Sequence, residues 1–165
     1  MEELHSRHPF SFLVPESSSA TVLDVAALDC EMIYTTGGFR VARVSIVDGS
    51  GKEVFDQLVR MDDGVHVMLV FATFFALLAD IELNLRDFNT RFSGITEEIY
   101  ATALLPLASI RDTLNTCLDS NTILIGHALD NDLKSLRILH HKCIDTALLF
   151  PHRAGAPYRR SLKDL

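Results

Sequence analysis

Two carboxylates separated by one residue, Asp29 and Glu31, follow an apolar stretch of the sequence. Alternate side chains of a strand project from the same face, so this spacing predicts that the two carboxylates lie together, with Cys30 on the opposite face. Adjacent anions repel each other unless a cation lies between them, and Mg²⁺ and Mn²⁺ prefer oxygen ligands. The pair therefore predicts a metal site, although a lone Asp-x-Glu is also typical of solvated acids at the end of a strand.

Asp132 is a third acid that can complete this site. It is expected at the start of a helix that follows a short apolar strand over residues 122–126. Ligands of open α/β sheets bind near the carboxyl ends of strands, and the ends of this strand and of the Asp29 strand are the natural ones to meet. Asp130 competes with Asp132 for this position, but Asp130 or Asn131 is also expected to cap the helix.

The sequence from residue 21 to residue 60 predicts a meander of three strands. Residues 21–32 form a nearly continuous apolar run, which indicates a strand buried on both faces. Residues 39–47 and 53–60 are expected as two further strands, with turn signals at residues 35–38 and 48–51. Connections this short require antiparallel neighbours.

The second half of the chain predicts helices and a crossover. Thr96 is expected to open a helix that carries acids in its first turn, and residues 106–117 place apolar side chains on one helical stripe. The helix after the 122–126 strand is expected to continue through Ile138 and Leu139, and residues 143–145 form the next strand. A strand-helix-strand unit makes these two strands parallel, so we predict an α/β fold with a mixed sheet.

Composition favours one ordinary globular domain. The chain has 165 residues and 48% hydrophobic residues, and we expect an N-terminal tether over residues 1–21 and a domain over residues 22–165. The net charge of −7 argues against a protein that coats nucleic acid through a broad basic face, but not against a nuclease whose carboxylates bind metal ions. Three cysteines without zinc-binding spacing, and no secretory signal, indicate an intracellular protein with reduced thiols.

Residues 65–79 form an apolar run. A helix of this length spans about 22 Å, which is short of the roughly 30 Å of bilayer hydrocarbon, so we expect no stable membrane span. We expect first a buried or surface-attached helix, and as alternatives an interfacial segment or an apolar insertion.

Four ordered motifs resemble the Rex-type RNA exonucleases, which belong to the DEDDh exonucleases. They lie at residues 27–32, 89–96, 124–133 and 149–153, and the resemblance covers roughly residues 24–62 and 86–165. It implies an RNase H-like fold, a nuclear or nucleolar location, and 3′-to-5′ removal of nucleotides from single-stranded RNA ends with two Mg²⁺ or Mn²⁺ ions. It also implies that Asp29, Glu31 and Asp132 are the catalytic, metal-binding acids, with Asp132 as the acid of the Gly-His-x-x-x-x-Asp motif.

The resemblance also implies a site for the terminal nucleotide. Met32, Asn89 and Arg91 match family positions near that nucleotide. Met32 or Phe92 is suited to contact its base, and Arg91 to contact a phosphate. The residues alone leave core packing open for Met32 and Phe92, and a solvated loop for Arg91.

Two departures from the family pattern shape the expected function. An apolar insertion is expected at about residues 64–85, and the later His-x-x-x-x-Asp that supplies the general base is not found beyond residues 158–162. His140 and Asp145 match that spacing, but His140 is expected about 12 Å from Asp132 along one helix, which makes the match a decoy. We therefore expect an incomplete exonuclease domain, or alternatively a catalytically inactive fragment that retains nucleic-acid or protein binding only.

Overall fold

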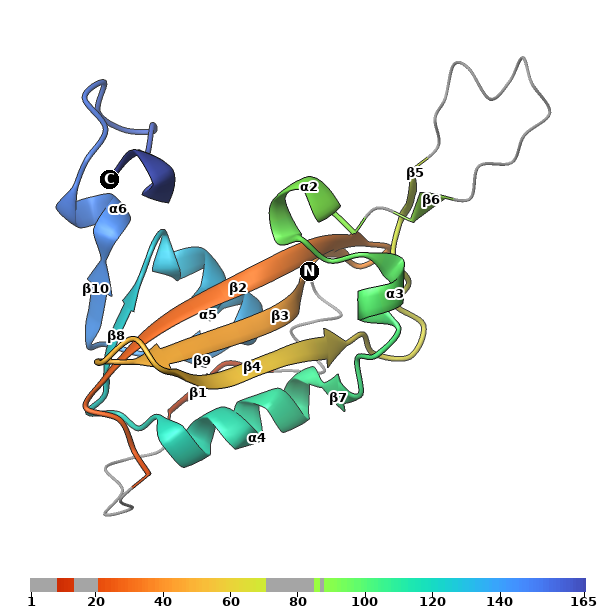
Figure 1. The fold of residues 1–165 in the computed structure, drawn as a ribbon, viewed down its shortest axis with the longest axis horizontal. Coiled ribbons are helices and arrows are strands. Elements are labelled where there is room, and N and C mark those ends of the chain that lie inside the picture. The colour runs from red at the N-terminus through yellow and green to blue at the C-terminus, as the bar shows by residue number, and fades with distance from the viewer. Residues whose placement is uncertain (1–8, 14–20, 71–84, 87) are drawn as a thin grey trace.

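The computed structural model describes residues 9–13, 21–70, 85–86 and 88–165 and has a mixed sheet at its centre (Figure 1). In this part of the chain the strand order is β10-β8-β2-β3-β4-β7. The strands are β2 (Val25–Thr35), β3 (Gly38–Asp48), β4 (Glu53–Arg60), β7 (Leu105–Pro106), β8 (Ile123–Gly126) and β10 (Cys143–Asp145). β2, β3 and β4 are antiparallel neighbours, whereas β8 is parallel to both β2 and β10. The predicted meander and strand-helix-strand unit are therefore both confirmed.

The two faces of β2 differ, because its side chains alternate in burial. Ala26 and Leu28 are fully or almost fully buried in the larger of two apolar clusters, which we call the main core. Asp29, which lies between Leu28 and Cys30, is exposed. The prediction of a strand buried on both faces is therefore wrong for β2. One face of the strand is left for polar side chains, which is where the acids lie.

Two helices cover the buried face of the sheet. They are α4 (Leu107–Cys117) and α5 (Leu129–Leu136). The predicted stripe of α4 is buried through Leu107, Ile110 and Leu114, which pack in one cluster with β2, β3 and β4. Leu129 and Leu136 of α5 belong to the same cluster, so the main core fixes α5 against the strand that carries Asp29 and Glu31.

The chain after α5 differs from the predicted long helix. Arg137 adopts a left-handed conformation with φ of 60°, which ends α5. Ile138–Leu139 then form β9, which pairs in parallel with β1 (Ser11–Phe12). The guanidinium of Arg137 also lies 3.8 Å from the ring centre of Phe10. Pairing with a distant segment therefore overrides the local helical pattern.

The same pairing shows that residues 9–13, which lie within the N-terminal tether expected over residues 1–21, pack against the domain. The backbone N–H of Ser11 donates to the carbonyl of Arg137, and Leu13 is buried in the main core. Residues 1–8 and 14–20 lie outside the described part of the chain. The described segment 9–13 is thus a packed part of the fold.

A smaller apolar cluster lies where β2 turns into β3. It joins the sheet to α2 (Thr90–Ser93) and α3 (Glu97–Tyr100) through Ile33, Ala42, Phe88 and Ile95. Thr96 caps α3 as expected, because its hydroxyl accepts a hydrogen bond from the N–H of Ile99. This cluster holds α2 beside the second half of β2 (Figure 1).

The apolar run 65–79 is described only over its first part. Val67 forms a bridge with Thr35, and β5 (Leu69–Val70) pairs with β6 (Leu85–Arg86) in a ribbon that projects from the end of the meander (Figure 1). The expected helix is therefore wrong for residues 65–70, which contain the Val67 bridge and β5 and no helical turn, and residues 71–79 lie outside the described part. None of the helices that the structure describes has the length and apolar content to cross a membrane.

Candidate active site

Asp29 and Glu31 lie in the middle of β2, opposite two polar residues of β3. The antiparallel register pairs Asp29 with Ser45 and Glu31 with Arg43. The two carboxylates share one face of the sheet, as their spacing predicts. β2 continues to Thr35, so the acids do not stand at the end of their own strand as expected. They lie instead beyond the point where β8 ends, because β8 pairs with β2 only up to Ala27.

A row of polar side chains continues across this face. The guanidinium of Arg43 donates to the carboxylate of Asp56 on β4, at 2.7 Å from Nε to Oδ1, and the hydroxyl of Ser45 lies 3.2 Å from the same oxygen. The hydrogen bond from Arg43 lowers the pKa of Asp56. Burial and then the neighbouring Asp29 raise the pKa of Glu31, and Arg43 opposes this rise.

Asp132 brings a third carboxylate to the same region from the first turn of α5. It is 6% exposed and lies on the buried side of the helix with Leu129 and Leu136. Burial, followed by the charge of Asp29, raises the pKa of Asp132 to about 7. Weaker contributions in the same direction come from three further acids, Asp130, Asp145 and Glu31. Acids from β2, α5 and β10 therefore repel one another, and a bound cation would relieve this repulsion.

The donor chemistry fits hard divalent cations, because the side chains that converge here are carboxylates. Among the described residues, however, no three His, Cys, Asp or Glu side chains stand close enough to hold one ion as they are placed. Joint binding of an ion by Asp29, Glu31 and Asp132 therefore requires their side chains to turn toward one another. The assignment of these three residues as ligands remains a prediction.

A side chain in place of Gly126 would crowd the turn from β8 into α5. A Cβ at Gly126 would lie 3.1 Å from the carbonyl oxygen of Leu28 and 2.7 Å from Cδ1 of Leu129. The close approach brings the carboxyl end of β8 against β2 one residue before Asp29. The Gly of the Gly-His-x-x-x-x-Asp motif thus permits the close approach of β8, and of the helix that follows it, to the strand that carries Asp29.

An apolar pocket of about 300 Å³ opens beside Asp29. His127 lines it together with Ala27, Ile125 and Leu162 of η2 (Leu162–Asp164). The ring of His127 is held on both sides, because Nδ1 lies 2.9 Å from the hydroxyl of Thr146 and Nε2 lies 2.8 Å from the carbonyl of Arg160.

The residues expected near the terminal nucleotide come together at the start of α2. The side-chain amide of Asn89 donates to the carbonyl of Met32 at 3.3 Å, and the hydroxyl of Ser135 on α5 lies 3.4 Å from the Met32 sulfur. Phe92 is 74% exposed, and the guanidinium of Arg91 lies 5.5 Å from its ring centre. Phe92 therefore does not pack in the core, whereas Met32 lies between α2 and α5.

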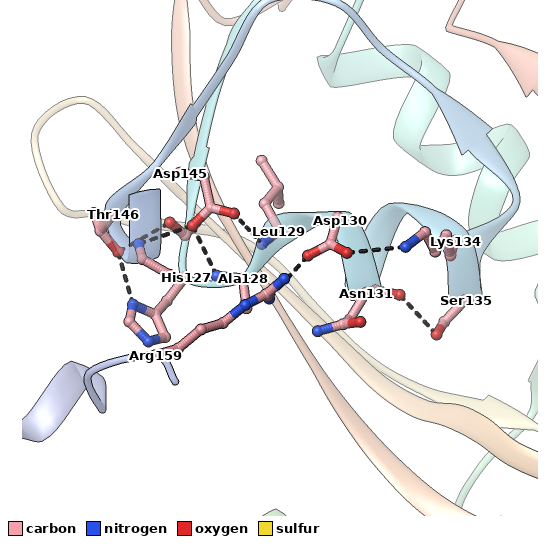
Figure 2. Close-up of polar contacts among 12 residues, drawn as sticks. His127, Ala128, Leu129, Asp130, Asn131, Lys134, Ser135, Asp145, Thr146 and Arg159 are labelled. Carbon is pink, nitrogen blue, oxygen red and sulfur yellow. Dashed lines mark hydrogen bonds and ion pairs between the residues drawn. The ribbon is translucent and has the colours of Figure 1, made fainter. Parts of the chain in front are cut away.

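Asp130 and Asn131 do not cap α5 as expected. The helix begins at Leu129, and Ala128 precedes it in a left-handed conformation. Asp130 instead pairs at the surface with Lys134, at 2.9 Å, and with Arg159, at 3.0 Å (Figure 2). The surface ion pairs leave Asp132 as the buried acid of this turn.

His140 and Asp145 also differ from the expected arrangement. His140 follows β9 rather than lying on the helix of Asp132, and its Nε2 lies 2.7 Å from the carbonyl of Thr122, just before β8. Asp132 follows β8, so His140 engages the opposite end of that strand. Asp145 is the residue that the sequence did not single out for this site, although an acid at the end of a strand and directly before a short helix is typical of a helix cap.

Several known proteins are similar to this chain in sequence. Human RNA exonuclease 1 homolog is 39% identical over 150 residues, which are 91% of this chain and 11% of that protein. RNA exonuclease 3 of Schizosaccharomyces pombe is 38% identical over 165 residues, which are 98% of this chain and 26% of that protein. The chain thus spans about a tenth to a quarter of the length of these relatives. No protein-family model matches it.

Solved structures support the fold. The structure of the Neurospora crassa Pan2 catalytic unit, with protease and nuclease domains, is similar over 93% of this chain and 24% of the Pan2 chain. The TM-score is 0.59 and the sequence identity is 19%. A Saccharomyces cerevisiae Pan2 UCH-Exo module in complex with AACCAA RNA is similar over 92% of this chain and 26% of the Pan2 chain. The TM-score is 0.59 and the sequence identity is 16%. At these identities the likeness concerns the fold alone.

Proposed function

We propose, since this chain belongs to the family of Rex-type RNA exonucleases and has their RNase H-like α/β fold, that it acts as a metal-dependent 3′-to-5′ exoribonuclease domain. The observation that carries the proposal is the place of Asp132, which is buried in the first turn of α5 on the side that faces the acids of β2. In agreement with this place, burial and then the charge of Asp29 raise the pKa of Asp132 to about 7. Two relatives that are named RNA exonucleases support RNA as the substrate class.

In this proposal Asp29, Glu31 and Asp132 hold two Mg²⁺ or Mn²⁺ ions. Such a pair activates a water and stabilises the leaving 3′-oxygen of a phosphodiester. The chain's own residues place the RNA end. The exposed ring of Phe92 offers a stacking surface for the terminal base, and Arg91 beside it offers a positive charge to a phosphate. Asn89 fixes the backbone of Met32, which keeps α2 beside the acids.

The proposal includes single-stranded RNA 3′ ends as the partner and a nuclear or nucleolar location, as the family resemblance implies. Stacking does not select a base sequence, which suits removal of successive nucleotides. Fluorescence microscopy of the tagged protein in cells tests the location, and a diffuse cytoplasmic signal contradicts it.

The test is shortening of RNA labelled at its 5′ end, so that 3′ shortening gives a ladder. We expect the purified chain with Mn²⁺ to produce this ladder slowly, so that it is visible only after long incubation, and Asp132→Asn and Asp29→Asn to abolish it. Asp130→Asn is the matched control, because Asp130 forms surface ion pairs in the same turn. Immediate release of the labelled nucleotide would instead show attack from the 5′ end, and equal ladders in all variants would place the chemistry elsewhere.

A second candidate function is binding of RNA ends without hydrolysis. It is favoured by the contacts of His127 and His140, whose ring nitrogens lie against protein oxygens, because neither ring is placed to take a proton from a water at the acids. RNA binding measured by fluorescence anisotropy distinguishes the two. Mn²⁺-dependent binding without any ladder supports the second function and contradicts the first.

A further inference from the structure

The helix that carries Asp132 begins without a capping side chain of its own. Ala128 is the N-cap residue of α5, and it has no polar side-chain atom. The first N–H groups of a helix need acceptors from outside the helix. Asp145 on β10 supplies them. Its Oδ1 accepts from the N–H of Ala128 at 2.8 Å, and its Oδ2 accepts from the N–H of Leu129 at 3.1 Å (Figure 2).

The same carboxylate also begins the next helix, α6 (Thr146–Leu149). Oδ1 of Asp145 accepts from the N–H of Ala147 at 2.9 Å. The parallel register pairs Asp145 with Gly126, the last residue of β8. One carboxylate thus fixes the starts of α5 and α6 at the position where β8 ends.

Thr146 holds the turn between β8 and α5 from the same side. Its hydroxyl lies 2.9 Å from Nδ1 of His127 (Figure 2). The same hydroxyl lies 3.1 Å from the carbonyl of Gly126. The residues from Gly126 to Leu129 are therefore bonded to two consecutive residues of the β10–α6 junction. The left-handed Ala128, with φ of 56°, is kept in this uncommon conformation by these contacts.

We propose that Asp145 is a positioning residue for Asp132. Asp132 lies three residues after Leu129, so the orientation of the first turn of α5 sets where its carboxylate points. Metal ligands must be held to within about half an ångström by the groups around them, and carboxylates behind the ligands commonly supply that restraint. The role of Asp132 as a ligand rests on the proposed function, whereas the control of the first turn of α5 by Asp145 does not.

Two variants separate the roles of Asp145. Asp145→Ser keeps a hydroxyl that can cap α6 through Ala147 but is too short to reach the two N–H groups of α5. Asp145→Asn keeps the size but places an N–H₂ group opposite the N–H of either Ala128 or Leu129. The matched control is Asp119→Asn. Asp119 is a buried acid before β8, whose Oδ1 accepts from the N–H of Asn121 at 2.7 Å and of Thr122 at 3.1 Å.

The first readout is independent of metal and activity. We expect hydrogen exchange of the backbone amides of residues 130–134 to accelerate at least tenfold in both Asp145 variants, and the ¹³Cγ signal of Asp132 to shift. In Asp119→Asn these signals should stay unchanged, even if this variant loses as much thermal stability as the Asp145 variants. Unchanged exchange and an unchanged Asp132 signal in the Asp145 variants would overturn the proposal.

The second readout is binding of Mn²⁺, followed by the electron paramagnetic resonance signal of the free ion. We expect at least a tenfold weaker affinity in Asp145→Ser and Asp145→Asn, and wild-type affinity in Asp119→Asn. Wild-type affinity for Mn²⁺ in both Asp145 variants would contradict the positioning role and show that Asp145 only caps the helices. If Asp132→Asn itself left Mn²⁺ binding unchanged, the proposed function would fail, and the exchange data would still decide whether Asp145 sets the turn.

Discussion

Arg43 and Asp56 form a two-point ion pair on neighbouring strands, with the guanidinium also opposite Glu31 across the β2–β3 pair. The pair places a fixed positive charge between the acids of β2 and the acid of β4. Its arrangement limits the repulsion on this face of the sheet, because Arg43 opposes the rise in the pKa of Glu31 and lowers the pKa of Asp56.

We predict that Arg43→Gln lowers the free energy of unfolding by about 1 kcal/mol at pH 7, the upper range for a partly exposed pair. The pKa of Asp56 is depressed in the folded state, so its stabilising contribution is present above the ordinary pKa near 3.9 and is lost as pH falls through the lowered value. The difference between variant and wild type should therefore shrink in acid. Urea unfolding at pH 7 and at pH 3 checks this. Arg60→Gln is the control, because its pair with Asp63 is a solvent-exposed contact of 3.7 Å.

Uptake of Mn²⁺ is predicted to depend on pH through Asp132. The ligand is the ionised carboxylate, and the pKa of Asp132 is about 7, so an ion that binds below pH 7 must displace a proton. The affinity should fall by up to about tenfold for each pH unit below about 7 and level off above it. Titration calorimetry at pH 6 in two buffers of different ionisation enthalpy measures the released proton. Equal apparent enthalpies in both buffers would contradict the prediction.

The same shift has a consequence for stability without metal. A folded-state pKa above the unfolded value near 3.9 means that the folded chain binds more protons than the unfolded chain between about pH 4 and 7. The contribution of Asp132 is therefore most favourable below pH 4 and is lost as pH rises to 7. We expect Asp132→Asn to be more stable than wild type at pH 8 and to gain little at pH 4. A loss of stability at pH 8 would show that Asp132 makes favourable contacts as an anion.

Phe92 is predicted to act on RNA and not on the fold. Its side chain is 74% exposed on α2, so Phe92→Ala should leave the melting temperature unchanged. Loss of one base-stacking contact costs about 1–3 kcal/mol of binding free energy, or roughly 5- to 150-fold in affinity. Fluorescence anisotropy of a short labelled RNA, with Ca²⁺ in place of Mn²⁺, measures this loss. Phe12→Ala on β1, 60% exposed, is the matched control, and an equal effect of both substitutions would argue against a stacking role.

The local parts of the fold and site were predictable from sequence. The turn predicted at residues 48–51 is present, because the carboxylate of Asp48 accepts hydrogen bonds from the N–H groups of Ser50 and Lys52. The strand predicted to follow this turn begins at Glu53, as expected. The shared face of Asp29 and Glu31 follows from strand periodicity alone, which needs no other part of the chain.

The parts that were not predictable depend on contacts between distant residues. α5 ends at Leu136 because the next residues pair with β1, more than 120 residues earlier in the sequence. Its start is capped by Asp145, 16 to 17 residues later, and not by the nearby Asp130 or Asn131. Local propensity cannot identify a cap that comes from another strand.

A slow rate of hydrolysis is the last prediction. Positioned proton transfer contributes about a hundred- to ten-thousand-fold to such reactions. Both ring nitrogens of His127 contact protein oxygens, and Nε2 of His140 contacts the carbonyl of Thr122 before β8, so these two histidines are not placed to act as the base. We expect residues 1–165 to shorten RNA near background with Mn²⁺ and to be accelerated by added free imidazole. The measurement is the rate of ladder formation against imidazole concentration, with Asp132→Asn as the inactive reference. Fast turnover that ignores imidazole and disappears in His127→Asn or His140→Asn would identify that histidine as the base and show that its hydrogen bonds break when RNA binds.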